Sequence, residues 1–260
     1  MKNGDTSVII SVWNRAENLA YCVRSALWQM HEPLEIIVVN YTDGPPVTVP
    51  DGVRLIHWPS NGQWNNPRAS NIGAANASGE RLAFLNCDNI MAPDLLYLAG
   101  RILDRDPLGH VYWERWDLSK DGLQALRSTE WLDLYTPLIA DMQGPFAGWW
   151  EKGTPSDAPG DFLMIDADIY KGLGGYDERY TGWGAYDSDL LARLVAEGHK
   201  EHRGGGVKLI HQHHELQSRK KTARNRHLYE MSKARVDKVR NGGRTHFERY
   251  EDGGQSCGSW

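Results

Sequence analysis

Three short polar clusters in this sequence carry side chains that can do chemistry. The first, Asn86–Asn89 (NCDN), ends the apolar run Leu82–Leu85 and has one carboxylate at its centre. In the second, two carboxylates follow a Gly-Trp-Gly loop at 182–184, and in the third, three histidines occur within residues 211–214 (HQHH). Carboxylates and imidazoles bind divalent cations and accept protons, so these clusters are the candidates for a reaction centre.

Asp88, the carboxylate of the first cluster, has two competing interpretations. An Asp after a strand is often a turn residue or a helix cap, and a helix is expected to begin near Asp94. Alternatively, Asp88 binds Mg²⁺ or Mn²⁺, which prefer oxygen ligands and share one or two protein carboxylates with the phosphates of a substrate. The residues by themselves favour neither interpretation.

The other two clusters also leave alternatives open. Asp187 and Asp189 open an amphipathic helical pattern, where acidic residues stabilise the first turn, but one of them could be a general base beside Trp183. Asp189 is expected to cap the helix or to pair along it. The histidines could form a zinc site, although no Cys is nearby, or a single His could complete a cation site at Asp88. Alternation along a strand would turn His211 and His213 to one side and His214 away, and we favour His211 because it directly follows an apolar run.

The elements that must position these clusters alternate between strands and helices, which predicts an α/β fold with a mostly parallel sheet. In such sheets, ligands bind at the carboxyl ends of the strands, and Asn14, Asn40–Asp43 and Asn86–Asn89 all lie just past expected strand ends. The expected strands are Ser7–Val12, Leu34–Val39, Val53–His57, Arg81–Leu85, Phe162–Ile165 and Val207–Ile210. The expected helices are Glu17–Trp28, Asn66–Ala77, Asp94–Arg105, Ile169–Gly174 and Asp187–Glu197.

Length and composition indicate one globular α/β domain. The chain has 260 residues, 40% hydrophobic residues and a net charge of −5, without an apolar window long enough for a transmembrane helix. Three cysteines without CxxC spacing predict a reducing, cytoplasmic location. The 11 Trp residues are core filler or surfaces that grip a sugar or a base, and several lie in the Trp-rich middle, roughly Val111–Gly160, whose periodicity is weak.

Residues 218–249 differ in composition, with eleven Lys and Arg residues against three acidic ones. We predict a basic helical extension there, which is a solvated helix, an anchor to anionic lipids, or a surface that follows nucleic-acid phosphates. The Gly/Ser-rich end, 250–260, is expected to be a disordered tail.

Four stretches resemble the inverting family 2 glycosyltransferases of the GT-A fold. SVIISVWNRAENLAYCVRSAL is similar to their first strand, Asn-Arg turn and first helix, and LEIIVVN with Asp43-Gly44 to the second strand and its acidic uridine-contacting end. PRASNIGAANASGERLAFLNCDN is similar to the stretch that leads into the Asp-x-Asp motif, and GGYDERYTGWGAYDSDLLARL to a galactosyltransferase-type C-terminal module. The resemblance runs from about Ser7 to His214 and leaves the Trp-rich middle unmatched.

The resemblance implies a Rossmann-like GT-A sheet flanked by helices, and a UDP-sugar donor bound with Mn²⁺ or Mg²⁺. It also implies that residues 1–110 form the nucleotide-sugar-binding half of the main domain and residues 111–217 its acceptor-binding and catalytic half. It implies Asp187 as the catalytic base, Asp88 as the metal-binding Asp of the Asp-x-Asp motif, and His211 or His213 as a further metal ligand. The expected donor-binding residues are Ser11, Trp13, Asn14, Arg15, Asn40, Arg68, Asn71, Asn86 and Asp88. The expected acceptor-binding residues are Trp149, Trp150, Trp183, Gly184 and Tyr186.

Three residues depart from the family pattern. Asn40 and Asn86 stand where the family has Asp, and Tyr186 stands where it has Glu before the base, which leaves acceptor recognition open. We expect a glycan acceptor, with a hydroxymethylated base of viral DNA as the alternative. A nucleotide-sugar-binding protein and a nucleotidyltransferase rank lower, the latter because no Gly-rich phosphate loop follows the first strand.

Overall fold

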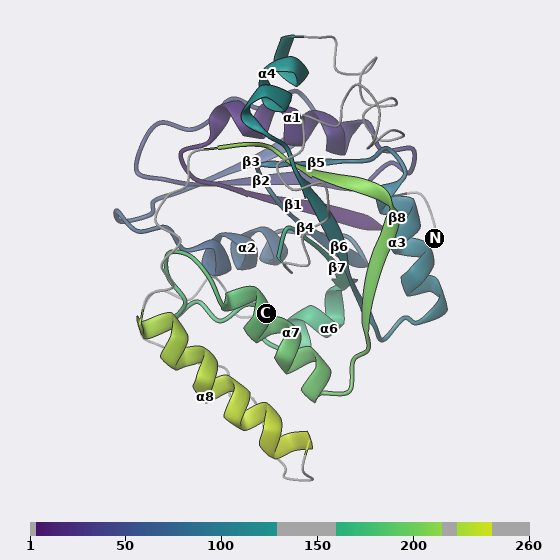
Figure 1. The fold of residues 1–260 in the computed structure, drawn as a ribbon, viewed down its shortest axis with the longest axis vertical. Coiled ribbons are helices and arrows are strands. Elements are labelled where there is room, and N and C mark those ends of the chain that lie inside the picture. The colour runs from purple at the N-terminus through teal and green to yellow at the C-terminus, as the bar shows by residue number, and fades with distance from the viewer. Residues whose placement is uncertain (1–3, 129–159, 215–222, 241–260) are drawn as a thin grey trace.

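The computed structural model describes residues 4–128, 160–214 and 223–240, and one eight-stranded sheet runs through this part of the chain (Figure 1). The order across the sheet is β3-β2-β1-β4-β7-β6-β8-β5. The strands are β1 (Thr6–Val12), β2 (Glu35–Tyr41), β3 (Val53–Trp58), β4 (Arg81–Asn86), β5 (Asn89–Met91), β6 (His110–Asp117), β7 (Phe162–Asp166) and β8 (Glu201–His211).

The first half of the sheet is parallel and follows the sequence prediction. β1 lies between β2 and β4, and β3 adds to β2, all in parallel register. The residues of β1 and of the apolar part of β2 are buried, because helices cover both faces of the sheet. The carboxyl ends of β1, β2 and β4 therefore lie at one edge of the sheet, which we call the carboxyl edge.

The second half of the sheet contains elements that the sequence pattern did not indicate. The short strand β5, the strand β6 and helix α4 (Lys120–Ser128) were not predicted, and β8 begins at Glu201 rather than at 207. β7 runs antiparallel to both β4 and β6, whereas β8 runs parallel to β6. Four of the seven strand pairings in the described chain are parallel, so the prediction of a mostly parallel GT-A-like sheet is confirmed.

Helices pack on both faces of the sheet (Figure 1). On one face, α1 (Ala16–Leu27), α3 (Leu95–Arg105) and α4 join a large apolar core with alternate residues of β1 and β4. On the other face lie α2 (Asn66–Ala75), α6 (Ala167–Gly172) and α7 (Tyr186–Ala196). No helix in the described ranges is long and apolar enough to cross a membrane.

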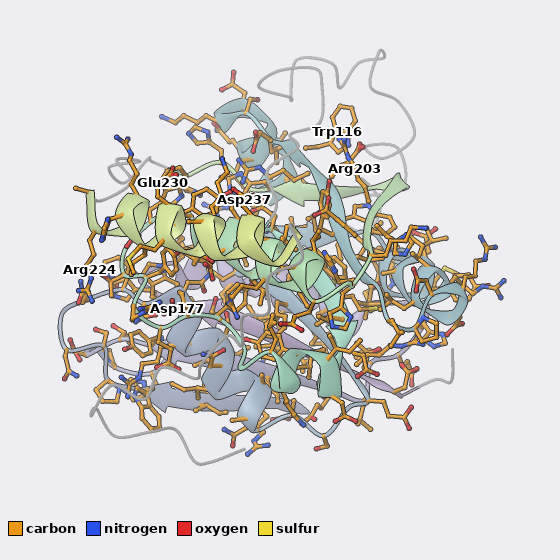
Figure 2. The ribbon with its side chains drawn as sticks, turned by 90° about the horizontal axis from the view of Figure 1, so that it is seen from below. Trp116, Asp177, Arg203, Arg224, Glu230 and Asp237 are labelled. Carbon is orange, nitrogen blue, oxygen red and sulfur yellow. The ribbon has the colours of Figure 1, made fainter. Side chains whose placement is uncertain are left out.

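Helix α8 (Ala223–Arg240) lies against α7 and confirms that the basic segment contains a helix. Leu228 and Tyr229 pack on the apolar cluster beneath α7, whereas Arg224 and Arg226 are exposed, and Figure 2 shows Arg224 with Glu230 and Asp237 along this helix. The predicted tail at 250–260 and the predicted acceptor residues Trp149 and Trp150 lie outside the described residues.

His110, at the first position of β6, makes the stability of the fold sensitive to acid. Its side chain is fully buried, neither ring nitrogen has a hydrogen-bond partner among the described residues, and the nearest carboxylate is Glu201, 3.9 Å from Nε2. Burial, together with the neighbouring His199 and His202, lowers the pKa of His110 to about 4. The unfolded chain takes up this proton near pH 6.5, whereas the folded chain resists it until about pH 4.

We therefore expect His110 to remove about 2–3 kcal/mol of stability as the pH falls from 7 to 4.5. In urea unfolding at both pH values, His110→Gln should lose less stability on acidification than the wild type does. The exposed His227 on α8 provides the control, since His227→Gln should leave the pH dependence unchanged. Equal acid losses in the wild type and His110→Gln would refute this assignment.

Candidate active site

The strand register brings three polar residues together at the carboxyl edge. β6 and β8 run in the same direction and end together, with Asp117 paired to His211. On the other side of β8, Asn89 pairs with His211, and the backbone N–H of Gln212 donates to the carbonyl of Asp88 at 2.8 Å. The turn that carries Asp88 is therefore fixed directly beside the end of β8.

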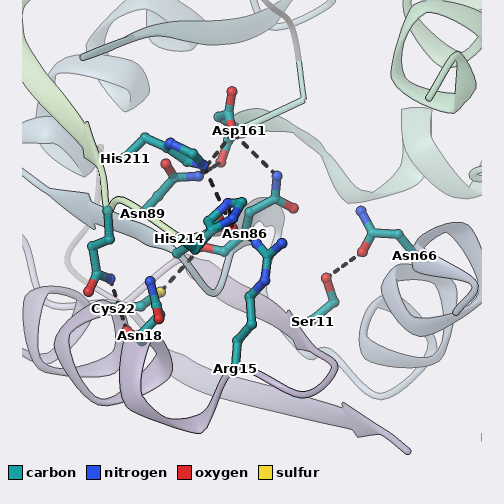
Figure 3. A network of polar contacts seen from close by, with 12 residues as sticks. Ser11, Arg15, Asn18, Cys22, Asn66, Asn86, Asn89, Asp161, His211 and His214 are labelled. Carbon is teal, nitrogen blue, oxygen red and sulfur yellow. Dashed lines mark hydrogen bonds and ion pairs between the residues drawn. The ribbon is translucent and has the colours of Figure 1, made fainter. Parts of the chain in front are cut away.

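Asp88, His211 and His214 form a cluster whose ligand atoms lie within 4.8 Å of one another. Asp88 Oδ2 is 3.2 Å from Nε2 of His214 and 3.7 Å from Nε2 of His211. The expectation that His214 would be turned away is wrong in this structure, because the cluster contains His214 and not His213. Strand alternation does not extend that far, because β8 ends at His211. Figure 3 shows His211 and His214 with Arg15, Asn86 and Asp161 around this centre.

The donor atoms of this cluster fit a divalent cation. One carboxylate and two imidazoles can together hold a divalent cation, and Oδ1 of Asp88 is buried without a hydrogen-bond partner in the described chain. Oδ2 of Asp88 is paired with the guanidinium of Arg15. Although burial raises the pKa of Asp88, its contacts with His211, His214 and Arg15 hold it well below the usual range. A carboxylate that stays ionised, with one oxygen unused, is suited to a cation.

Asp117, which the sequence pattern did not indicate, contacts the far side of the His211 ring. Its Oδ1 lies 3.0 Å from Nδ1 of His211 and 3.0 Å from Nε of Arg115. Burial lowers the pKa of His211, but its contacts with Asp117 and Asp88 outweigh this and raise it to about 9.

Asp161 is a second residue that sequence reasoning missed. It lies just before β7, whose antiparallel direction places its first residues at the carboxyl edge. Arg115 donates to its Oδ2 at 2.8 Å, and the side-chain amide of Asn89 donates to its Oδ1 at 3.3 Å and to its carbonyl at 3.1 Å. The predicted donor residue Asn86 also contacts this segment, donating to the carbonyl of Gly160 at 3.0 Å.

Asp187, in the first turn of α7, lies against the same segment. A Cβ at Gly160, which has a φ of +111°, would be 2.3 Å from the carboxylate of Asp187, so only glycine permits this approach. The hydroxyl of Tyr176 donates to Oδ1 of Asp187 at 3.3 Å. Burial, and then the charge of Asp161, raises the pKa of Asp187 well above the usual range, as expected of a proton acceptor that works near neutral pH.

Asp189, two residues further along α7, has a different role. Its Oδ2 pairs with Nε of Arg193 at 2.8 Å, and its Oδ1 accepts from the hydroxyl of Tyr180 at 3.2 Å. Both oxygens are thus used inside the fold, which confirms the prediction that Asp189 pairs along its helix. Asp187 is the acid of this cluster that remains a candidate base.

The loop before α7 presents Trp183 and is held by α8. Trp183 is 49% exposed, and Gly182, Gly184 and Ala185 all have positive φ. Asn225 is fully buried, and its Nδ2 donates to the carbonyls of Thr181 (2.9 Å), Gly184 (3.1 Å) and Trp183 (3.4 Å). Sequence reasoning missed Asn225, whose partners lie more than forty residues away.

Several predicted donor-binding residues line the neighbouring part of the edge. Trp13 is half-buried after β1 and stacks on Trp64, with ring centroids 5.8 Å apart and planes 5° apart. Ser11 donates to Asn66, whose amide in turn donates to the hydroxyl of Tyr186 at 3.0 Å. The remaining residues of this group are Asn14, exposed with a φ of 54°, and Arg68, whose Nε lies 3.9 Å from Glu178.

Asn71 and Asn40 were both predicted to bind the sugar donor, but their side chains make hydrogen bonds within the fold. Asn71 is buried, and its amide donates to Tyr176 and Glu178 while its oxygen accepts from Tyr170 and Tyr176. This uses its full capacity and makes it a support for the loop before α7. The oxygen of Asn40 likewise accepts from the backbone of Val47 at 2.9 Å.

Asp43, the acidic residue after β2, uses both of its carboxylate oxygens in hydrogen bonds within the fold. Its two oxygens accept from the backbone of Ser60, Asn61 and Gly62 and from the hydroxyl of Ser60. These hydrogen bonds lower the pKa of Asp43. The carboxylate thus fixes the turn that follows β3.

Two protein-family models together match most of this chain. Residues 7–148 match the model of glycosyl transferase family 2, and residues 156–229 match the model of the N-terminal domain of galactosyltransferase. An uncharacterized glycosyltransferase of Nostoc sp. is 35% identical over 99 residues, or 35% of this chain and 30% of the relative. One of Rickettsia bellii is 26% identical over 136 residues, or 49% of this chain and 19% of the relative. The chain thus spans less than a third of these relatives.

Solved structures share the fold. The crystal structure of S. aureus TarS 1-349 in complex with UDP-GlcNAc has a TM-score of 0.61 and 12% identity, covering 90% of this chain and 70% of that one. A second crystal structure of S. aureus TarS 1-349 has a TM-score of 0.58 and 11% identity, covering 90% of this chain and 69% of that one. At this identity, the likeness concerns the fold alone.

Proposed function

Because this chain belongs to the family 2 glycosyltransferases, we propose that it is a metal-dependent, inverting enzyme that transfers a sugar from a UDP-sugar to an acceptor hydroxyl. One observation carries the proposal. A cluster suited to a cation (Asp88, His211 and His214) and a partly buried carboxylate with a raised pKa (Asp187) lie at the same edge of the sheet. TarS, which has a similar fold, was solved in complex with UDP-GlcNAc, and this supports a UDP-sugar as the donor.

In the proposed reaction, sugar transfer is a single displacement at C1 of the sugar. The acceptor oxygen forms a bond to C1 of the sugar, while the bond from C1 to the diphosphate oxygen breaks and UDP leaves with the electron pair. Asp187 takes the proton of the acceptor hydroxyl as the new bond forms. Attack from the face opposite the leaving group inverts the anomeric carbon.

Asp88, His211 and His214 would hold Mn²⁺ or Mg²⁺. Such a cation supplies positive charge for the diphosphate as its negative charge grows. Arg15, paired with Asp88, brings a second positive group to the same place. Trp13 and Ser11 remain our proposal for the nucleotide side, and Trp183, Gly184 and Tyr186 for the acceptor side.

For the acceptor we propose a glycan, with nucleic acid as the second candidate. One observation supports the nucleic-acid candidate. The exposed Arg224 and Arg226 flank Asn225, whose side chain holds the loop that carries Trp183. These cations would contact phosphates of an acceptor bound over Trp183. Salt separates the two candidates, because phosphate contacts release counterions and a neutral glycan does not.

A panel of UDP-sugars tests the proposal. We expect hydrolysis or transfer of at least one UDP-sugar with Mn²⁺ or Mg²⁺, and none with EDTA. Adding oligosaccharides or hydroxymethylated duplex DNA to the productive donor should identify the acceptor, and a steep fall in activity between 50 and 200 mM salt would favour DNA. Turnover that persists unchanged in EDTA would contradict metal dependence, and no turnover of any UDP-sugar would contradict the donor.

A further inference from the structure

We propose that Asp117 is a positioning residue that orients His211 toward a cation at Asp88, an inference that rests on the proposed metal-dependent function. Nothing in the motifs that resemble family 2 includes Asp117. It lies at the end of β6, a strand that the sequence pattern did not indicate, and it reaches the site through the pairing of β6 with β8.

The two nitrogens of His211 have separate contacts. Nδ1 lies 3.0 Å from Oδ1 of Asp117, and Nε2 faces Oδ2 of Asp88 at 3.7 Å. A hydrogen on Nδ1 that is donated to Asp117 leaves Nε2 as the nitrogen whose lone pair can face a cation. Histidine ligands of metals usually have such a carboxylate, which fixes the tautomer and the ring orientation.

Asp117 is itself held in place. Arg115 lies two residues earlier on β6. Its Nε is 3.0 Å from Oδ1 of Asp117, and its Nη1 is 2.8 Å from Oδ2 of Asp161. The backbone N–H of Leu118 donates to the carbonyl of His211 at 2.9 Å, which ties the chain after Asp117 to the end of β8. The side chains of Asp117 and His211 are both about nine-tenths buried, at 11% and 12% exposure.

Arg115 also connects Asp117 to the surroundings of the proposed base. It joins Asp117, which contacts the His211 ring, to Asp161, whose charge raises the pKa of the proposed base Asp187. The cation ligand and the surroundings of the base are therefore connected through one partly buried arginine. Asp117 contacts neither the donor nor the acceptor in this scheme and acts through His211.

Mn²⁺ affinity in the presence of saturating UDP, measured by calorimetry, tests the inference without relying on turnover. We expect Asp117→Ala to weaken Mn²⁺ binding by about 10–100-fold. Asp117→Asn, which keeps the shape and an acceptor oxygen but loses the charge, should weaken it less and guards against misfolding of the Ala variant. Glu114→Ala on the same strand, whose partner is Arg203 rather than His211, is the matched control and should bind Mn²⁺ as the wild type does.

A double-mutant cycle with His211→Ala separates positioning from a general structural effect. If Asp117 acts through His211, replacing Asp117 in the His211→Ala background should cause no further loss of Mn²⁺ affinity. Full additivity of the two losses would overturn the inference, as would unchanged affinity in both Asp117 variants. Failure of the wild type to bind Mn²⁺ at all would instead show that the proposed cation site is wrong.

Discussion

Asp187→Asn is expected to lower sugar transfer by about 10²–10⁴-fold, which is the usual cost of losing a positioned general base. The amide cannot take the proton of the acceptor hydroxyl, but it has the same shape and still accepts from Tyr176. The affinity for UDP should therefore stay close to that of the wild type. Transfer rates at saturating donor and acceptor, with UDP binding measured in parallel, check both parts of this expectation.

Asp189→Asn provides the control because this residue lies in the same first turn of the helix and is fully buried. The amide removes the negative charge that pairs with Arg193 at 2.8 Å, so the melting temperature should fall, whereas the transfer rate per folded molecule should change little. If Asp189→Asn abolished transfer and Asp187→Asn did not, the base would be misassigned.

The pH dependence of the same assay gives a second readout. Burial and Asp161 raise the pKa of Asp187 well above its usual range, so this group stays protonated to a higher pH than an ordinary Asp, whose pKa is about 3.9. The transfer rate of the wild type should then fall as the pH is lowered through this raised pKa. The residual activity of Asp187→Asn should lack this acid limb.

Asp88→Ala is expected to lower transfer by on the order of 10³-fold or more, because a bound cation contributes several kcal/mol to the departure of the diphosphate. Unlike the change at Asp187, this substitution should also weaken the part of UDP binding that depends on Mn²⁺. Calorimetry of UDP with Mn²⁺ and with EDTA measures that part directly. UDP binding that is the same for the wild type with EDTA, for the wild type with Mn²⁺ and for Asp88→Ala would exclude Asp88 as a ligand.

The two histidines after β8 provide a matched comparison for the cation site. His214 lies 3.2 Å from Asp88 and belongs to the cluster of ligand atoms, whereas His213, which strand alternation favoured, does not. His214→Ala should therefore weaken Mn²⁺ binding clearly, and His213→Ala should weaken it much less. The opposite order would restore the interpretation that follows from strand alternation.

The sequence by itself determined the elements that repeat a pattern and the chemistry of residues that follow them. β1, β2, β4, α1, α2 and α7 begin and end within a few residues of the predicted positions, because their apolar periodicity is strong. Asp88 and Asp187 could be identified as candidates because each follows a recognisable local feature, a buried strand or a Gly-Trp-Gly loop. Pairing of Asp189 within its own helix is likewise a local, i to i+4, interaction.

Only the tertiary structure decided which residues surround these two acids. Asp117, Asp161 and Asn225 lie in or beside stretches without clear periodicity, and their partners are far away in sequence. The pairing of β6 with β8 places Asp117 at His211, and the antiparallel entry of β7 places Asp161 at the carboxyl edge. The end of β8 at His211 brings His214 to Asp88. Strand order, direction and termination depend on contacts across the sheet, which local sequence patterns do not encode.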